Sequence, residues 1–157
     1  MAYDSPAEAV SQASIGYGSH FHIFQTEDSP MDWLDLGEVT SITPPSATTD
    51  IIDVTHMQSP GGRREFVPGL IDPGECSFDM NYIPGSAGDT YLLGLLDLAP
   101  ALRKRRCKII YPNQVADVFE ALIQTYAPTV PVDDKMTATV TFKVTGTVDR
   151  GLDSPTA

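Results

Sequence analysis

The sequence predicts a mainly β fold, an antiparallel β-sandwich or open barrel with one flanking α-helix. Apolar residues alternate with threonine and lysine over residues 136–148, which is the period of a strand with one buried face. Residues 75–83 alternate in the same way. Strands with one wet face are typical of antiparallel sheets, and a single segment of the chain has clear helical spacing.

The individual elements follow from local composition and from the prolines that end them. The expected strands, in chain order, span residues 20–25, 33–42, 49–55, 75–83, 106–111, 118–126 and 136–148. The strand at 118–126 also scans as a helix on propensity, but Pro112 before it and Pro128 after it isolate a strand-length segment. A helix is expected over residues 88–99, where leucines recur at three- and four-residue spacing before Pro100.

Residues 56–73 form an unusually long connection. The segment has three glycines, three prolines and no hydrophobic period, and a loop of this length inside a compact domain is usually functional. At its centre Arg63, Arg64 and Glu65 precede Phe66. An exposed phenylalanine beside two guanidinium groups predicts a surface that docks on another protein.

Length and charge exclude several classes of protein. With 157 residues the chain is large enough for one core, which we place at residues 19–148, between an N-terminal arm (1–18) and a C-terminal arm (149–157). Its 21 acidic and 10 basic side chains give a formal charge of −11, which disfavours ordinary nucleic-acid binding. No apolar run approaches the ~20 residues of a membrane-spanning helix, and the N-terminal arm lacks the features of a secretory signal, so we expect no membrane partner.

Half of the positive charge lies in one short run. It consists of Arg103, Lys104, Arg105, Arg106 and Lys108. Such a run could bind nucleic acid, but the acidic chain favours a second interpretation. The run follows the expected helix and leads into a strand, where cations interact favourably with the helix dipole and can pair with an acidic neighbouring subunit.

The sequence offers no convincing catalytic group. His20 and His22 would share one strand face and could both reach a metal, but two imidazoles without a third ligand make a weak site, so we interpret them as ordinary strand histidines. Cys76 and Cys107 are too isolated for a zinc pattern, and we expect two buried thiols in a reducing cytoplasm. Nucleophile-elbow and phosphate-binding glycine motifs do not occur in the sequence. The sequence therefore predicts no enzyme, no cofactor and no metal.

Two blocks of the sequence resemble the major tail tube proteins of long-tailed, lambda-like siphophages. They are IIDVTHMQSPGGRREFVPGLIDPGECSFDMNYIPG at 51–85 and PVDDKMTATVTFKVTG at 131–146. The resemblance implies a tail tube fold related to the tube proteins of type VI secretion and of gene transfer agents. It also implies a structural virion protein whose hexameric rings stack into a hollow tail tube that conducts the genome from capsid to host during ejection.

The same resemblance implies partners. Subunits would assemble in the bacterial host cytoplasm around a tape-measure protein, would meet tail terminator and baseplate or tip proteins, and would let DNA pass without specific binding. The long loop would reach towards a neighbouring ring through six residues, Gly61, Gly62, Arg63, Arg64, Glu65 and Phe66.

The wall of such a tube needs a face that DNA can pass. We hypothesise that the lumen is lined either by the polar face that carries Glu75 and Asp79, or by the threonine face of residues 137–145. An acidic bore would repel the phosphate backbone, so DNA would move through it without binding.

Other functions are left open by the sequence. A gene transfer agent or a tail-like bacteriocin would use the same kind of subunit. A monomeric β-sandwich binding module belongs to a different class and predicts aromatic side chains clustered on one exposed surface. Here the aromatic residues fall mostly on expected core faces, apart from Trp33 and Phe66. A small hydrolase would need a convergent catalytic group.

Overall fold

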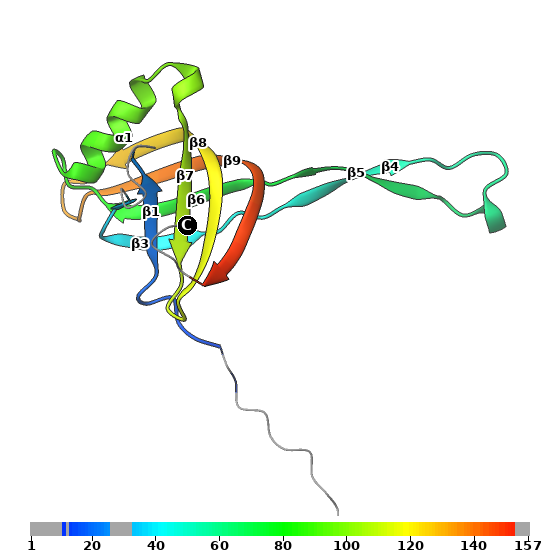
Figure 1. The fold of residues 1–157 in the computed structure, drawn as a ribbon, viewed down its shortest axis with the longest axis horizontal. Coiled ribbons are helices and arrows are strands. Elements are labelled where there is room, and N and C mark those ends of the chain that lie inside the picture. Colours follow the sequence, from blue (N-terminus) through cyan, green and yellow to red (C-terminus); the bar gives the residue numbers. More distant parts are fainter. Residues whose placement is uncertain (1–10, 12, 26–32, 153–157) are drawn as a thin grey trace, which may run out of the picture.

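The computed structural model, which describes residues 11, 13–25 and 33–152, contains one curved antiparallel sheet of seven strands (Figure 1). In order across the sheet these strands are β2 (Trp33–Asp35), β1 (His20–Phe24), β7 (Lys104–Ile110), β8 (Val115–Thr129), β9 (Thr137–Leu152), β6 (Glu75–Asn81) and β3 (Val39–Thr43). The sheet wraps around so far that β1 contacts β3 from the other end of this order. The predicted mainly β class, with an open barrel, is confirmed.

One helix covers one end of the barrel. Helix α1 (Ala87–Asp97) begins after Ser86, whose hydroxyl oxygen accepts a hydrogen bond from the Asp89 backbone N–H at 3.2 Å. Leu92 and Leu95 on the inner side of the helix are buried in the core of the barrel. The helix predicted from leucine spacing is therefore present, with ends that differ by one or two residues.

Three phenylalanine rings form the centre of the core. Phe21 of β1, Phe78 of β6 and Phe142 of β9 lie with ring centroids 4.4 to 6.2 Å apart. Each sits on the buried face of its strand, and the neighbours in sequence face outward. Burying one such side chain contributes roughly 1.5–3 kcal/mol, so this cluster is a main source of the barrel's stability.

The two cysteines belong to the same core. Cys76 and Cys107 are free and fully buried, as expected for structural thiols. Burial raises the pKa of Cys76 to about 12, so this thiol is protonated at neutral pH.

Strands β4 (Thr48–Asp53) and β5 (Phe66–Asp72) form a separate two-stranded hairpin that projects far from the barrel (Figure 1). We call residues 48–72 the arm. Because β4 follows β3 and β5 leads into β6, the arm continues the β3–β6 pair at the edge of the barrel. Prolines at positions 44, 45 and 73 lie at the junction. Gly74 has a φ of +84°, and a Cβ there would overlap the carbonyl oxygen of Ser46. The junction therefore requires glycine at this position.

The prediction of a single strand over residues 33–42 is wrong. The segment forms β2 and β3, which lie at opposite ends of the seven-stranded sheet. Between them Gly37 and Glu38 adopt φ values of +59° and +37°, and the buried Leu36 donates its backbone N–H to the Phe21 carbonyl at 3.2 Å. The chain turns there because it must cross from one end of the curved sheet to the other.

The prediction of an irregular loop over residues 56–73 is also wrong. The second part of this segment, seven residues long, is strand β5, which pairs with β4 from Phe66 opposite Asp53 to Asp72 opposite Thr48. Pro68 lies beside a register irregularity, which is a position where a strand tolerates proline.

Strands β8 and β9 are both longer than predicted. Strand β8 confirms the strand interpretation over the helical one and continues through Pro128. Strand β9 runs to Leu152, so residues 149–152 of the predicted C-terminal arm pair with β8. The predicted arm residues 1–10, 12 and 153–157 lie outside the described residues.

Candidate assembly surfaces

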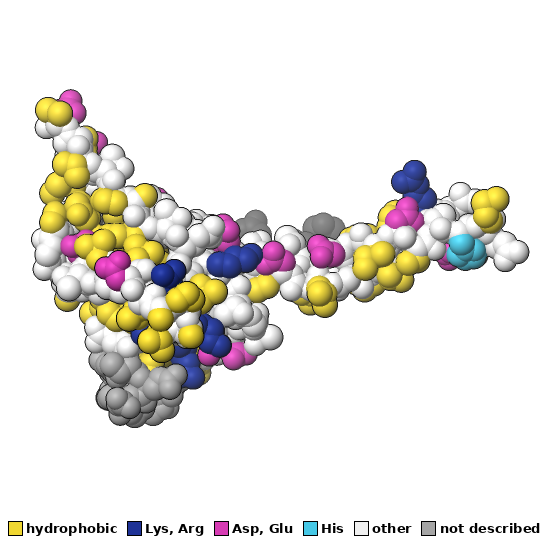
Figure 2. Space-filling view, turned by 90° about the horizontal axis from the view of Figure 1, so that it is seen from above, with side chains coloured by type: hydrophobic (Ala, Val, Ile, Leu, Met, Phe, Trp, Pro, Cys, Tyr) yellow, Lys and Arg dark blue, Asp and Glu magenta, His cyan; other side chains and the backbone are white. Residues whose placement is uncertain are grey.

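The arm exposes many of the large apolar side chains of the described residues. All of β4 and nearly all of β5 are exposed, because a two-stranded ribbon has no layer behind it (Figure 2). Its exposed large apolar side chains are Ile51, Ile52, Val54, Met57, Phe66, Val67, Leu70 and Ile71. A hairpin alone cannot bury such side chains, and exposed apolar side chains gathered on one projecting element mark an interaction site.

The tip of the arm is an ordered turn. Glu65 accepts a hydrogen bond from the Ser59 hydroxyl at 2.6 Å and lies 3.3 Å from the His56 imidazole. Gly61 and Gly62 both have left-handed φ values near +64°. Of the six residues predicted to contact a neighbouring ring, Glu65 therefore shapes the turn.

The tip of the arm also carries the side chains of Arg63, Arg64 and Phe66. Arg63 and Arg64 are exposed and form no ion pair with another described residue. Phe66, where β5 begins, is 54% exposed. These three side chains are free to contact another molecule.

The two faces considered for the lumen are one continuous surface. In the antiparallel register of β6 and β9, Ser77 lies opposite Thr141 and Asp79 lies opposite Thr139. The Thr139 hydroxyl donates a hydrogen bond to the Asp79 carboxylate at 2.7 Å. We call this surface the polar face, and it comprises Glu75, Ser77, Asp79, Asn81, Thr137, Thr139, Thr141, Lys143 and Thr145.

Lys143 is the single cation of the polar face as defined, and it is paired. Its ammonium group lies 2.8 Å from Asp72 at the end of β5. This contact lowers the pKa of Asp72, and a hydrogen bond from the Gly74 backbone adds to the effect. Glu75 and Asp79 therefore give the polar face a net negative charge.

The side chains of the basic run mostly contact other groups within the subunit. Arg103 donates to the Leu98 carbonyl at 2.7 Å, where α1 ends, as the helix-dipole interpretation predicts. Lys104 pairs with Glu120 at 3.1 Å, and Arg105 donates to the Tyr91 hydroxyl at 3.1 Å. The guanidinium carbon of Arg106 lies 5.8 Å from the centre of the Phe24 ring. A contact of this run with a neighbouring subunit stays a prediction.

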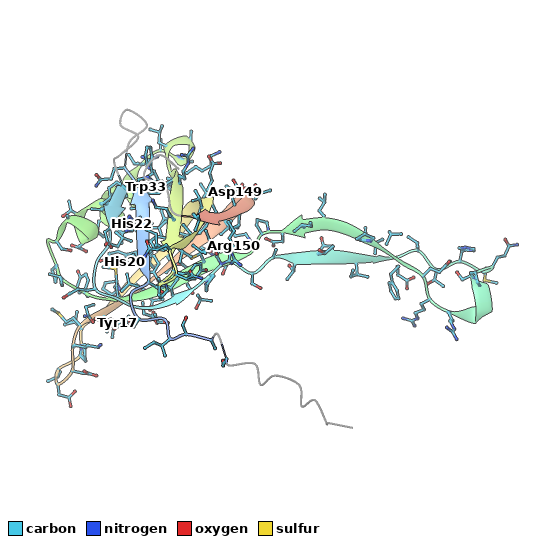
Figure 3. All side chains as sticks on the ribbon, turned by 60° about the horizontal axis from the view of Figure 1, so that its bottom comes forward. Tyr17, His20, His22, Trp33, Asp149 and Arg150 are labelled. Atoms are coloured by element: carbon cyan, nitrogen blue, oxygen red, sulfur yellow. The ribbon has the colours of Figure 1, made fainter. Side chains whose placement is uncertain are left out.

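The fold places a third potential metal ligand beside the histidine pair. His20 and His22 point to the same side of β1 (Figure 3), and Asp35 of β2 lies beside them. The carboxylate of Asp35 is 3.1 Å from His20 Nδ1 and 3.6 Å from His22 Nε2. The position of Asp35 beside the histidines could not be predicted from the sequence, because the pairing of β2 with β1 has no local signal.

The arm itself left a weak signal in the sequence. Two apolar pairs, Phe66–Val67 and Leu70–Ile71, flank Pro68 and Gly69 and match the apolar pair in β4. Interpreting these pairs as a strand interrupted by a bulge would have predicted β5.

No helix among the described residues is long and apolar enough to span a membrane.

Comparison with known proteins identifies relatives of this fold. The model of the lambda phage tail tube protein family matches residues 16–150. No individual curated protein matches the sequence. A subunit from the tail of an empty gene transfer agent particle, determined with C6 symmetry, has a TM-score of 0.68 at 14% identity, covering 90% of this chain and 100% of that chain.

Two further solved structures share the architecture. The SPP1 tail tube has a TM-score of 0.64 at 11% identity, covering 90% of this chain and 81% of that chain. A chain of the anti-feeding prophage baseplate has a TM-score of 0.69 at 8% identity, covering 90% of this chain and 97% of that chain. At such low identity these likenesses establish a common fold.

Proposed function

Because the chain belongs to the lambda phage tail tube protein family, we propose that six copies close into a ring and that these rings stack into the hollow tube that conducts the genome. The role is structural, and the subunit acts as one segment of a wall. The fold it shares with a tail determined with C6 symmetry supports the sixfold ring. Gene transfer agents share this fold, so a gene transfer particle is the alternative setting of the same tube.

The observation that carries this proposal is the exposed apolar arm. Its side chains cannot be covered by the barrel, because the arm projects beyond it (Figure 1). We assign the occupant as a second copy of this chain, since a tube subunit repeats the same surfaces along the tube. The arm then reaches a neighbouring ring, and Arg63, Arg64 and Phe66 at its tip make the far contacts.

The open edges of the barrel offer a second contact. Strands β2 and β3 end the seven-stranded order, and each pairs with a strand of this sheet on one side only. Unpaired strand edges are a hazard for a monomer and a means of assembly for a ring. Neighbouring subunits in a ring would continue the sheet through these edges.

The polar face is our candidate for the lumen. It presents hydroxyl groups and the exposed carboxylates of Glu75 and Asp79, with the charge of Lys143 offset by Asp72. Repeated around a ring, this surface would repel phosphate groups and leave them no cationic binding site.

The remaining partners follow from the same role. We propose that subunits assemble in the host cytoplasm around a tape-measure protein and end in the virion tail, against tail terminator and baseplate or tip proteins. Family membership supports this order of events.

Negative-stain electron microscopy of the purified chain tests the assembly. We expect rings or hollow rods from the wild type, and a monomer at every concentration would contradict the proposal. Asp53 pairs with Phe66, so residues 54–65 can be replaced by an Asn-Gly turn that closes β4 directly onto β5. This shortened arm should yield folded subunits that do not form rods.

A point variant removes apolar surface without shortening the chain. Leu70→Ser changes an arm side chain that is 84% exposed, and Val132→Ser changes a fully exposed side chain between β8 and β9 as the matched control. Both variants should fold as the wild type does. Only Leu70→Ser should reduce rod formation, and normal rods from it would contradict the role of the arm.

The lumen assignment needs a charge test. We expect Glu75→Lys with Asp79→Lys to slow DNA ejection at unchanged tail length, because cations in the bore would hold phosphates. The control, Asp97→Lys with Asp133→Lys, makes the same charge change at exposed sites outside the polar face. Ejection at the wild-type rate by the first variant would exclude the polar face as the lumen.

A further inference from the structure

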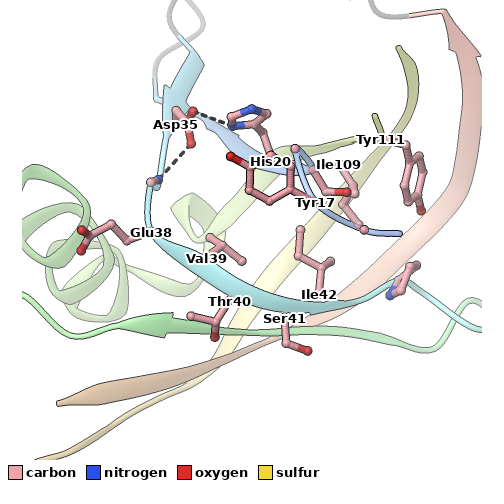
Figure 4. A pocket seen from close by; sticks show the side chains of 15 residues that line it. Tyr17, His20, Asp35, Glu38, Val39, Thr40, Ser41, Ile42, Ile109 and Tyr111 are labelled. Atoms are coloured by element: carbon pink, nitrogen blue, oxygen red, sulfur yellow. Dashed lines mark hydrogen bonds and ion pairs between the residues drawn. The ribbon is translucent and has the colours of Figure 1, made fainter. Parts of the chain in front are cut away.

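Three side chains of types that can bind a metal form a compact cluster on β1 and β2. His20 and His22 project from one face of β1, and Asp35 is the cross-strand partner of His22. One ligand atom from each residue lies within 4.8 Å of the other two. Figure 4 shows the Asp35 carboxylate beside the His20 ring, with the hydrogen bonds of its two oxygens drawn as dashed lines.

The spacing suits a divalent transition metal. An ion about 2.1 Å from each ligand atom holds adjacent ligand atoms about 3.0–3.4 Å apart in octahedral or tetrahedral geometry. The Asp35 carboxylate lies 3.1 Å from His20 Nδ1 and 3.6 Å from His22 Nε2. Small rotations of the imidazole rings would bring all three atoms to one ion.

The cluster is both held in place and open to solvent. The second oxygen of Asp35 accepts a hydrogen bond from the Gly37 backbone N–H at 2.9 Å, which fixes the carboxylate plane. The side chain of His22 is 21% exposed and that of His20 is 53% exposed, so an ion can enter. A cleft of about 790 Å³ beside His20 and Asp35 gives room for water ligands.

The neighbouring strand β7 carries a cation opposite His22. Lys108 of β7 is the cross-strand partner of His22, but its ammonium group lies 4.5 Å from the centre of the Trp33 ring. The side chain is thus directed to the aromatic ring of β2 at the far end of the β1–β2 pair from His20.

We propose that His20, His22 and Asp35 bind one divalent transition-metal ion of the Zn²⁺, Co²⁺ or Ni²⁺ class, with water completing its coordination. Both imidazoles bind in the neutral form, so binding releases any proton that they carry. The ion joins the three-residue edge strand β2 to β1 and so stabilises one end of the sheet. This inference concerns the isolated subunit and stands apart from tube assembly.

Calorimetric titration of the full chain with Zn²⁺ tests the site. The wild type should bind one ion per subunit. A free Zn²⁺ concentration one hundred times the dissociation constant should raise the melting temperature by roughly 5–10 °C. Co²⁺ should give a visible absorption spectrum without a sulfur-to-cobalt charge-transfer band, since the buried Cys76 and Cys107 are not ligands. Failure to bind either ion, or a thiolate band, overturns the proposal.

Single variants locate the ion. His22→Ala and Asp35→Asn should each weaken Zn²⁺ binding at least about tenfold. His20→Ala, at the more exposed position, gives the same test if His22→Ala does not fold by circular dichroism. His56→Ala is the matched control, because His56 pairs with Glu65 in the arm. Unchanged binding in His20→Ala and Asp35→Asn, or loss of binding in His56→Ala, places the ion elsewhere and overturns the proposal.

Discussion

In the barrel, Phe142 and Val140 are fully buried between neighbouring strands, whereas in the arm Ile51 is 63% exposed and Leu70 is 84% exposed. Both regions consist of antiparallel strands with branched and aromatic side chains. They differ in what lies behind the strands. The curved sheet of the barrel surrounds its own core and is covered at one end by α1, while the arm has solvent on both faces.

This difference separates what the subunit does alone from what it does in an assembly. The apolar contacts of the barrel form when one chain folds, so they determine the stability of the subunit. The apolar contacts of the arm need a second molecule, so substitutions there should change assembly with little change in subunit stability.

The largest expected effect is in the core of the barrel. Phe142→Ala removes a fully buried ring from the three-phenylalanine cluster and should lower the free energy of unfolding by about 3–5 kcal/mol. Phe66→Ala removes an arm ring that is 54% exposed, and it should change the same free energy by no more than about 0.5 kcal/mol. Urea denaturation of both variants measures the difference. Equal losses would show that the arm packs within the subunit.

The junction between the two regions should be the next most sensitive place. Gly74→Ala introduces a Cβ against the Ser46 carbonyl at a φ of +84°, so the backbone must shift. We expect a loss of about 1–3 kcal/mol, together with impaired rod formation because the direction of the arm changes. Gly151→Ala, where a Cβ meets nothing within 4 Å, is the control. Normal rods from Gly74→Ala would mean that assembly tolerates a reoriented arm.

The same contrast explains which parts of the fold the sequence could predict. The strands β6 and β9 and the helix α1 were predictable because each shows its buried face as a local period, such as Cys76, Phe78 and Met80. The arm has no buried face and therefore no such period, although β4 overlaps the strand expected over residues 49–55. Its strand β5 also contains Pro68, which normally argues against a strand.

The pairing of strands that lie far apart in the sequence could not be predicted either. Nothing near Asp35 in the sequence indicates that β2 returns to β1 and places its carboxylate beside His20 and His22. Likewise the residues of the polar face appeared as two alternatives, because only the register of β6 with β9 shows that Ser77 and Thr141 are neighbours. Composition and period could predict these residues as polar and exposed, but their grouping depends on the folded sheet.

The smallest predicted effect concerns two ion pairs, one in the barrel and one at the base of the arm. Asp117 in the barrel accepts hydrogen bonds from Arg150 at 2.7 Å and from the Tyr111 hydroxyl at 2.8 Å, and its side chain is only 2% exposed. These bonds, led by that from Arg150, lower the pKa of Asp117. Its stabilising effect is thus complete above the unfolded value of about 3.9 and is lost as the pH falls through the lower folded value.

Asp117→Asn should therefore cost about 1–2 kcal/mol at pH 7, and the difference from wild type should shrink below about pH 4. Asp72, which pairs with Lys143 at the base of the arm, also has a lowered pKa, but both side chains are about half exposed. Solvent screens that pair, so Asp72→Asn should change the pH dependence of unfolding much less. Urea denaturation between pH 3 and pH 7 measures both. A larger effect from Asp72→Asn would mean that the base of the arm, rather than the barrel, limits the stability of the subunit in acid.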